Sequence, residues 1–403
     1  MISFEFDRKS PVIILKNPLS GRLETVLLGT SLVFGCSGGG EPLVPRLEGD
    51  GCASHSAVQP LNIPDCLLSR GIIDQADRDS STRLLQGAMA RVELFRSVRS
   101  ADNLERAARI ARSLDQVATM HQRGLLDDSA RFHRMMDVVS VAIEIAEERA
   151  VISAGRVRPD ATPHLIWYSY DKIGVFFQPV TTSRQVASVL PSASVPTDTL
   201  LAIADHLYRY ALWRDRDGRR FPVWEYLFPW SAGGVRLDPP WISAMSQGLV
   251  MSIFAEAHRR TGLPLWRTRA YEAFSSFQVS WSDGGVRLDD TTHGYWWEEF
   301  DPRIRIWNGS VQALVGVGFV WTVTQDTAVK RVFDRGIESL KYYTPQYDTG
   351  RWTLYSLTQG HNTVAYHNYH VELLDVLFSQ TGDPWFRTTA DRWRSYTPPP
   401  GIR

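Results

Sequence analysis

The second half of the chain repeats two short segments, and these repeats constrain the fold more than any other feature. The sequence GGVRLD occurs at 233–238 and again at 284–289, each time followed by an aromatic-rich loop that leads to a helix. Residues 261–274 and 381–396 both open with Thr-Gly-x-Pro and continue as an amphipathic pattern. Glycine commonly ends one helix and proline begins the next, so each of these turns is expected to join the two helices of a hairpin.

Helical periodicity predicts seven helices in this half of the chain. Their expected ranges are 199–213, 241–260, 265–278, 307–323, 327–344, 366–380 and 384–396. Hairpins repeated every roughly 50 to 60 residues are typical of repeat architectures. We therefore predict a mainly α protein in which residues 199–403 form an α/α toroid, an incomplete α/α barrel of helical hairpins around a central cleft. The alternative is an irregular helical domain that reuses the same turn sequences.

The distribution of aromatic residues divides the 403-residue chain near residue 160. All 14 Trp and all 14 Tyr lie at or after Trp167. Before that point, apolar residues at helical spacing on both sides of Gly124 predict a helical hairpin over 101–160. Residues 161–198 combine aromatic and β-branched residues and are expected to be β-rich. The region 37–100 begins with many Gly, Pro, Ser and Asp residues and is predicted to be a linker or poorly ordered.

The first 36 residues permit two interpretations. The sequence TVLLGTSLVFGCSGGG around Cys36 resembles a bacterial lipoprotein signal, with a short apolar run, a cysteine and a Gly-rich tether. This interpretation predicts an extracytoplasmic, lipid-anchored protein in which Cys52 and Cys66 are able to form a disulfide. In the alternative, the apolar runs are strands, the protein is cytoplasmic and the three cysteines are free thiols.

Charge and hydropathy exclude some classes of partner. The formal net charge is zero, so the chain as a whole has no field that favours nucleic acid or a membrane surface. No stretch approaches the roughly 20 apolar residues that span a bilayer. We therefore expect neither a nucleic-acid partner nor a transmembrane segment.

Three segments concentrate polar aromatic and charged residues: HGYWWEEFDPRIRIWNGS at 293–310, YDTGRWTLYSL at 347–357 and HNTVAYHNYH at 361–370. In a toroid these inter-helix segments are expected to face one cleft. His367 and His370 are three residues apart, but no HExxH pattern accompanies them to complete a zinc site. Hydrolysis of a glycoside would need a carboxylate across the sugar from Glu298 or Glu299, a role for which Asp348 is the candidate.

Several motifs resemble the C-terminal domain of the D-glucuronyl C5-epimerases, which convert glucuronic to iduronic acid within heparan-sulfate-type chains. The resemblance is colinear over about residues 222–397. It rests on WISAMSQG at 241–248, WWEEF at 296–300, WNGS at 307–310, GIESLKYYTPQYDTGRWTLYSL at 336–357, YHNYH at 366–370 and GDPWFRTTADRWRSY at 382–396. It implies an α/α barrel preceded by β-rich elements.

The same resemblance implies the site residues. It assigns catalysis to Glu299, Tyr355 and Tyr366, with Glu298 supporting. Substrate contacts are expected from Trp297, Phe300, Arg303, Arg305, Asn308, Tyr347, Arg351 and His367. Two positions depart from the family pattern: Phe300 stands where a tyrosine is usual, and Thr358 stands where an arginine is usual. Arg303, Arg305 or Arg351 is the expected replacement for that missing cation.

The expected activity is C5-epimerisation of D-glucuronic to L-iduronic acid within a heparosan-like or other uronic-acid polysaccharide. A base and an acid on opposite faces of C5 would remove and return the proton, and cations or strong donors would stabilise the carboxylate. No cofactor is expected, and a structural calcium ion and a homodimer are left open. The alternatives are a polysaccharide lyase, in which the carbanion expels the substituent at C4, and a non-catalytic glycan-binding module.

Overall fold

The computed structural model describes residues 13–16, 23–26, 59–148, 155–290, 292–298 and 300–402. The chain divides into two compact units, Met1–Gly49 and Asp50–Arg403. In the first unit, β1 (Ile13–Lys16) and β2 (Leu23–Val26) pair antiparallel, which agrees with strands in the apolar runs. Cys36 and Cys52 lie outside the described residues. Cys66 is disulfide-bonded, and its predicted pairing with Cys52 stays a prediction.

The second unit begins with helices where we expected a linker. The expectation for 37–100 is wrong from residue 60 onward, because η1 (Pro60–Asn62), α1 (Ile63–Ser69) and α2 (Gln75–Val98) occupy this stretch. The Asp74 side chain caps the start of α2 by accepting from Asp77 N–H at 2.8 Å. The buried face of α2 consists of small and aliphatic side chains, Ser81, Leu85, Ala88 and Val92.

The predicted helical hairpin is present as α3 (Ala101–Gln122) and α4 (Ser129–Glu148), and α2 packs against both helices. Ser100 caps α3, and Asp128 accepts from Arg131 N–H at 3.0 Å at the start of α4. One detail of the prediction is wrong. Leu104 is exposed, because the buried face of α3 is rotated toward Ala107, Ile110, Leu114 and Val117.

Short antiparallel sheets follow the helical hairpin. The strands β3 (Gly155–Val157), β4 (Trp167–Tyr170) and β5 (Gly174–Phe177) form one sheet in the order β3-β4-β5. Helices α5 (Pro179–Ser183) and α6 (Thr197–Tyr210) come next, and both pack against α7 (Ala244–Thr261). The remaining strands form two-stranded hairpins: β6 (Leu212–Arg216) with β7 (Arg219–Val223), β8 (Trp230–Ala232) with β9 (Val235–Leu237), and β10 (Arg287–Asp290) with β11 (Gly294–Trp297).

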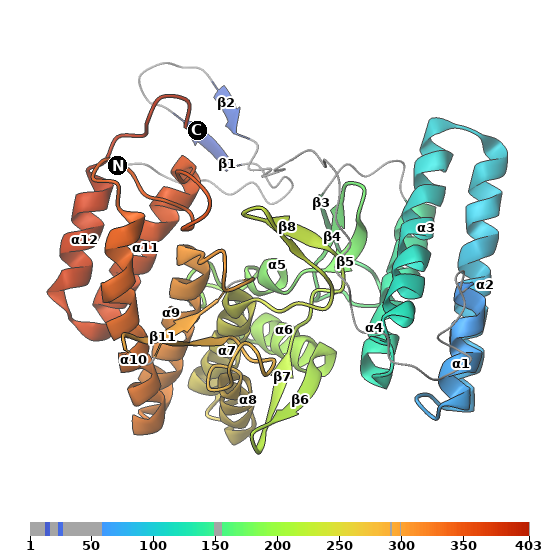
Figure 1. Cartoon of the computed structure of the whole chain (residues 1–403), viewed down its shortest axis with the longest axis horizontal. Helices are drawn as coiled ribbons and strands as arrows, with labels where there is room; N and C mark the ends of the chain where they lie inside the picture. Colours follow the sequence, from blue (N-terminus) through green and yellow to red (C-terminus); the bar gives the residue numbers. More distant parts are fainter. Residues whose placement is uncertain are drawn as a thin grey trace. The chain divides into compact units, whose positions relative to one another are not determined.

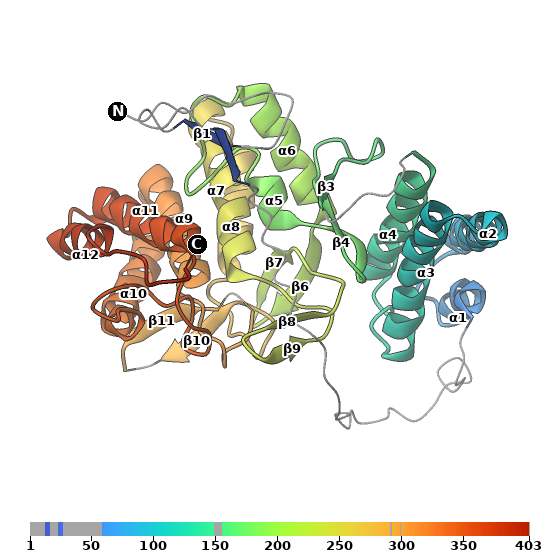
Figure 2. The same cartoon turned by 90° about the horizontal axis from the view of Figure 1, so that it is seen from above.

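The C-terminal helices form hairpins in two layers, which can be followed from yellow to red in Figures 1 and 2. In the inner layer α7 packs against α9, and α9 packs against α11. Each inner helix also packs against the outer helix that follows it. The helices are α7 (Ala244–Thr261), α8 (Pro264–Ser275), α9 (Trp307–Thr324), α10 (Thr327–Tyr343), α11 (Val364–Thr381) and α12 (Pro384–Arg394). The fold is therefore mainly helical with small antiparallel sheets, and these hairpins form the predicted incomplete α/α barrel.

Local sequence explains how these hairpins turn and pack. Helices α7 and α11 end at Gly262 and Gly382, which have φ of 67° and 68°, and proline begins the next helix two residues later. Gly248 lets α7 approach α9 closely, because a Cβ at this position would lie 2.8 Å from the Cα of Ala313. Of the helices that the structure describes, none is long and apolar enough to cross a membrane.

Candidate active site

The segment with the two adjacent glutamates joins the first turns of α7 and α9. Glu298 is 1% exposed, and its main-chain carbonyl accepts from Ala244 N–H at 3.2 Å. Its carboxylate accepts from Ile306 N–H at 3.3 Å and from the indole N–H of Trp296 at 3.1 Å. A carboxylate at a helix N-terminus is also stabilised by the helix dipole. Glu298 therefore fixes the chain between two inner helices, and its supporting role in catalysis stays a prediction.

Glu299, the predicted catalytic carboxylate, lies outside the described residues, so its role stays a prediction. The next residue, Phe300, is half-buried. Its ring meets the ring of Trp241 edge-on, with centroids 5.2 Å apart and planes at 89°. Phe300 also packs against a small buried group that we call the Ile304 cluster: Ala232, Ile304 and Ile306.

The two predicted catalytic tyrosines lie together beside the start of α9. Tyr355 packs against the Ile304 cluster, and its ring is 5.0 Å from that of Tyr366, at 71°. The carbonyl of Tyr355 accepts from Trp307 N–H at 3.2 Å. Tyr366 is in the first turn of α11, where its N–H donates to the Thr363 hydroxyl at 3.3 Å. Two segments that are separate in the sequence therefore bring both phenol rings to one place.

The two histidines of the YHNYH motif belong to the wall behind these tyrosines. His367 is buried, stacks on Trp352 at 3.7 Å, and bonds through Nδ1 to the Thr353 hydroxyl (2.9 Å) and through Nε2 to the Trp393 carbonyl (3.0 Å). Burial lowers the pKa of His367 and, more strongly, that of His370. Both rings are therefore neutral near pH 7 and serve as packed hydrogen-bonding groups.

Within the described residues, one group of three possible metal ligands lies close enough together to share an ion. It consists of Glu144, Glu148 and Asp160, far in sequence from the tyrosine loops. His367 and His370 are not part of it. Among the residues of the site that the structure describes, no three side chains form such a ligand set.

Three residues predicted to contact substrate lie in the core. Trp297 is 1% exposed and donates its indole N–H to the Phe277 carbonyl at 3.0 Å. Tyr347 is fully buried, and its hydroxyl donates to the Arg305 carbonyl at 2.8 Å. Asn308 is buried in the first turn of α9 after the N-cap Ile306, so it is not itself the N-cap. The burial of Trp297 and Tyr347 does not favour the predicted contacts with sugar.

The three candidate arginines differ in their surroundings. Arg303 is exposed and binds both carboxylate oxygens of Asp301 at 2.7 Å. Arg351 is exposed on the turn after Asp348. Arg305 is half-buried, and its guanidinium lies 5.8 Å from the Trp296 ring, while its buried Nη1 has no hydrogen-bond partner among the described residues. Of the three, Arg305 has the most suitable environment for a substrate carboxylate.

Asp348, the candidate second carboxylate for hydrolysis, is already bound on several sides. It accepts from the Trp393 indole at 2.8 Å, from the Tyr396 hydroxyl at 2.7 Å and from Gly350 N–H at 2.8 Å. Burial would raise the pKa of Asp348, but these hydrogen bonds and the charge of Arg392 bring it below the usual value. Asp348 therefore attaches its turn to α12, and this does not favour a role in hydrolysis.

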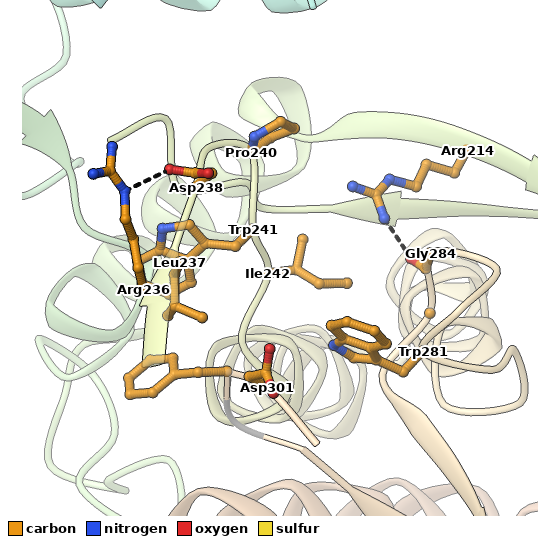
Figure 3. A pocket seen from close by; sticks show the side chains of 12 residues that line it. Arg214, Arg236, Leu237, Asp238, Pro240, Trp241, Ile242, Trp281, Gly284 and Asp301 are labelled. Carbon is orange, nitrogen blue, oxygen red and sulfur yellow. Dashed lines mark hydrogen bonds and ion pairs between the residues drawn. The ribbon is translucent and has the colours of Figure 1, made fainter. Parts of the chain in front are cut away.

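A cavity of about 290 Å³ lies on the Trp241 side of Phe300. Figure 3 shows Trp281, Asp301, Arg236 and Ile242 around it. Both copies of GGVRLD contribute to its lining, the first through residues 236–238 and the second through Gly284 and Gly285. Sequence analysis identified the repeat but missed the cavity residues Trp281, Arg214 and Asp301. The position of Trp281 just before the second copy was the available signal.

Comparison with known proteins identifies the domain that holds the tyrosine pair and the cavity. Residues 218–395 match the family described as D-glucuronyl C5-epimerase C-terminus. This part of the chain is similar to the C-terminal domain of that family. The resemblance inferred from the motifs is thereby confirmed for this region.

Two curated relatives and one solved structure resemble the chain. It is 30% identical over 181 residues to the D-glucuronyl C5-epimerase of Caenorhabditis elegans, and the aligned region covers 40% of this chain and 29% of that protein. It is 24% identical over 185 residues to an uncharacterized protein of Methanocaldococcus jannaschii, covering 45% of this chain and 59% of that protein. The solved structure is a GH76 alpha-mannanase from Bacteroides thetaiotaomicron, with a TM-score of 0.40, 14% identity, and 59% of this chain and 64% of the other covered. The chain thus spans less than two thirds of each relative.

The structure shows what surrounds Phe300 and Thr358, the two residues that depart from the epimerase pattern. Phe300 packs on Trp241, and a ring without a hydroxyl suits this contact. Thr358 lies against the turn of β8–β9, since a Cβ on Gly233 would be 2.6 Å from the Thr358 hydroxyl. Gly233 has φ of 55°, so glycine is favoured there on conformational grounds as well. A longer side chain at position 358 would have to point away from this turn.

Proposed function

We propose that this chain is a uronate C5-epimerase that converts D-glucuronic to L-iduronic acid residues within a heparosan-like or other uronic-acid polysaccharide. The observation that carries the proposal is the pairing of Tyr355 with Tyr366 at the start of α9. Both residues lie within the 218–395 region that matches the epimerase family.

The proposed reaction moves one proton. A base removes the C5 hydrogen, which is acidified by the adjacent carboxylate, and an acid on the opposite face returns a proton. The phenol of Tyr366 acts on one face and Glu299 on the other, with Tyr355 assisting through its contact with Tyr366. Tyrosine has an ordinary pKa of about 10, so its neutral form donates a proton readily. The reaction has no redox step and requires no redox cofactor.

Negative charge develops on the substrate carboxylate when the C5 proton leaves. A preorganised cation lowers the free energy of that intermediate. We assign this role to Arg305, because its buried Nη1 has no hydrogen-bond partner among the described residues and Arg303 is bound to Asp301. Thr358 supplies no charge, so the cation comes from a different segment than in the family pattern.

The substrate and compartment follow from the same proposal. A uronic-acid polymer is polyanionic, and such polymers are found outside the cytoplasm. The disulfide at Cys66 supports an extracytoplasmic location, because disulfides persist in oxidising compartments. Anchoring through Cys36 stays a prediction of the sequence, and so does a homodimer.

The test is hydrogen exchange at C5. A glucuronic-acid polymer incubated with the protein in deuterated water should gain deuterium at C5 while the chain length stays unchanged, as measured by NMR and mass spectrometry. An ultraviolet-absorbing unsaturated end would instead identify a lyase. Binding of the polymer without either product would identify a non-catalytic glycan-binding module.

The variant Tyr366→Phe tests the tyrosine pair. Loss of an acid or base typically slows a reaction by about 10²- to 10⁴-fold, and we expect exchange to fall within that range. Tyr369→Phe is the matched control, because it also removes a phenol hydroxyl from α11. The hydroxyl of Tyr369 donates to the Gln312 side chain at 2.6 Å. We expect the control to lose less than about tenfold. Equal rates for Tyr366→Phe and the parent protein would refute the assigned role of Tyr366.

A further inference from the structure

We propose that the cavity between the two GGVRLD copies binds a neutral sugar ring of the polysaccharide, next to the uronate that is epimerised. This inference rests on the proposed function and adds a second binding site to it. Phe300 is the shared neighbour of the two places, because it lines the cavity and packs against the Ile304 cluster, against which Tyr355 also packs. The cavity is thus close to the tyrosines, and one polysaccharide chain can occupy both.

Trp281 provides the sugar-binding surface. It is 39% exposed, although large aromatic side chains in this domain are mostly buried. An indole offers a rigid apolar face with one polar edge, which suits the C–H face of a pyranose. Such an exposed ring beside a cavity of about 290 Å³ differs from a scattered surface aromatic because a ligand can contact it and the cavity together.

The loop that carries Trp281 is held in place before any ligand binds. The main-chain N–H of Trp281 donates to the Arg287 carbonyl at 2.7 Å, and the main-chain carbonyl of Trp281 accepts from Gly284 N–H at 3.2 Å. Arg214 donates to the Gly284 carbonyl and also binds the buried Glu225 at 2.7 Å. Ordering of this loop therefore adds little to the entropic cost of binding.

The charges around the cavity favour a neutral ring. Among the described residues that line it, each charged side chain has an ion-pair partner. The pairs are Arg236 with Asp238, Arg214 with Glu225, and Asp301 with Arg303. A uronate carboxylate in the cavity would have to compete with one of these pairs. Hydroxyl or amide groups of a neutral sugar can instead donate to the carboxylates and accept from the guanidinium groups without breaking a pair.

The apolar part of the lining completes the site. Leu237, Ile242 and Trp241 are buried residues that line the cavity, and Figure 3 shows Ile242 and Trp281 among the side chains around it. Pockets for small ligands begin at roughly 300 Å³, so the cavity suits one sugar ring better than a longer segment. An apolar floor with paired charges at the rim matches the two faces of a pyranose.

The binding test uses the Tyr366→Phe protein, so that the ligand is not converted. Calorimetry compares glucuronic acid alone with an alternating glucuronate–N-acetylhexosamine tetrasaccharide and with a tetramer of glucuronate only. In Trp281→Ala we expect the affinity advantage of the alternating tetrasaccharide over the single uronate to fall about tenfold. Trp281→Phe keeps an aromatic face and should retain most of that advantage. Tyr342→Ala, which removes a 50% exposed aromatic that does not line the cavity, is the matched control.

Several outcomes would overturn the inference. An unchanged advantage in Trp281→Ala would show that the cavity takes no part in binding. If Trp281→Ala lost as much affinity for the glucuronate-only tetramer as for the alternating tetrasaccharide, the proposed preference of the cavity for a neutral ring would be wrong. Binding of neither tetrasaccharide by the parent protein would reject the site as well. If wild-type protein binds the alternating tetrasaccharide but never exchanges C5 hydrogen, the proposed epimerase activity fails, while the Trp281 comparison still decides the binding site.

A spectroscopic measurement tests the neutral ring directly. Protein labelled with 5-fluorotryptophan gives a fluorine resonance for Trp281 that the Trp281→Phe variant assigns. We expect this resonance to shift on addition of N-acetylglucosamine and to respond at least several-fold more weakly to glucuronic acid. The reverse order of response would overturn the proposed preference.

Discussion

Two buried glutamates bind segments that contribute to the candidate site, and they differ in their hydrogen-bond partners. Glu225 binds the guanidinium of Arg131 from α4 through both oxygens, at 2.7 and 3.0 Å, and that of Arg214 from β6 at 2.7 Å. Glu298 accepts from neutral donors, the Ile306 N–H and the Trp296 indole N–H. The carboxylate of Glu225 joins segments that are distant in the sequence, whereas Glu298 reaches a distant segment through its main-chain carbonyl, which accepts from Ala244 N–H.

The difference shows two ways of using a buried carboxylate. Glu225 compensates two cations, so it connects the helices before residue 150 with the wall of the cavity through charge. Glu298 positions the chain at the tyrosine site through hydrogen bonds that direct the backbone at the starts of α7 and α9. A change at Glu225 should therefore mainly affect folding stability, while a change at Glu298 should mainly affect local geometry.

The largest effect is expected from Glu225→Ala. This change leaves Arg131 and Arg214 without their carboxylate, and their side chains are only 16% and 22% exposed. Removal of one partner of a buried ion pair typically costs about 3–5 kcal/mol, and we expect the free energy of unfolding to fall by that amount. Urea denaturation followed by circular dichroism measures it.

The control for this prediction is Glu338→Ala. Glu338 pairs with Arg335 on the surface of α10, and its side chain is 57% exposed. Exposed pairs contribute about 0–1 kcal/mol, so this variant should unfold close to the wild type. If both variants lost the same stability, Glu225 would have no special role as a buried connection.

A smaller effect is expected from Glu298→Gln. Glutamine keeps one acceptor oxygen, but its NH₂ group replaces the other oxygen of the carboxylate. One of the two donors, Ile306 N–H or the Trp296 indole N–H, therefore loses its acceptor. A buried donor without an acceptor costs about 1–3 kcal/mol, and we expect a loss near the lower end of that range. Urea denaturation of Glu298→Gln beside Glu225→Gln compares the two carboxylates. A loss at Glu298 as large as that at Glu225 would contradict the expected difference between the two carboxylates.

The C-terminal helices were predictable because their signals are local. Thr-Gly-x-Pro turns and helical periodicity placed the expected helix at 307–323 against the observed α9 at Trp307–Thr324, and the others to within a few residues. The structure brings Tyr355 and Tyr366 together, but their catalytic roles stay predictions, as does the pairing of the disulfide-bonded Cys66 with Cys52. The helix α2 was missed because its Gly, Ser and Asp residues outweighed the buried Leu85, Ala88 and Val92 in the composition.

Side-chain environment was less predictable than the helices. Trp296 and Trp297 are consecutive on β11, yet both are 1% exposed. The burial of Trp297 depends on close packing against Gly336, where a Cβ would lie 2.3 Å from the Trp297 ring. The cavity was missed because its walls come from two repeats about 50 residues apart, and periodicity does not show which side chains meet. Trp281 and Asp301 become candidates only when the two hairpins are seen together.

The smallest expected effect is a difference in acid stability that separates Glu225 from the buried histidines. Burial would raise the pKa of Glu225, but its hydrogen bonds and charge interactions with Arg131 and Arg214 bring the pKa below its ordinary value. The unfolded chain takes up this proton near the ordinary pKa of about 4.3, whereas the folded protein does so at lower pH. The stabilisation is thus present above about pH 4.3 and is lost as pH falls through the folded pKa.

The histidines act at higher pH. Burial lowers the pKa of His370, so the unfolded chain binds its proton near pH 6.5 while the folded protein does not, and stability falls as pH drops below about 6.5. Each such proton changes the unfolding free energy by at most about 1.4 kcal/mol per pH unit. In urea denaturation between pH 3 and 8, His370→Gln should therefore show a shallower decline of stability below about pH 6.5, and the part that remains comes from His367, whose pKa is also lowered by burial. The stability gap between Glu225→Gln and wild type should stay constant there and narrow only below about pH 4.3, because wild type alone loses the charged carboxylate. If the difference in unfolding free energy between Glu225→Gln and wild type already narrows at pH 6, the stabilisation by Glu225 depends on the protonation of the buried histidines as well as on Arg131 and Arg214.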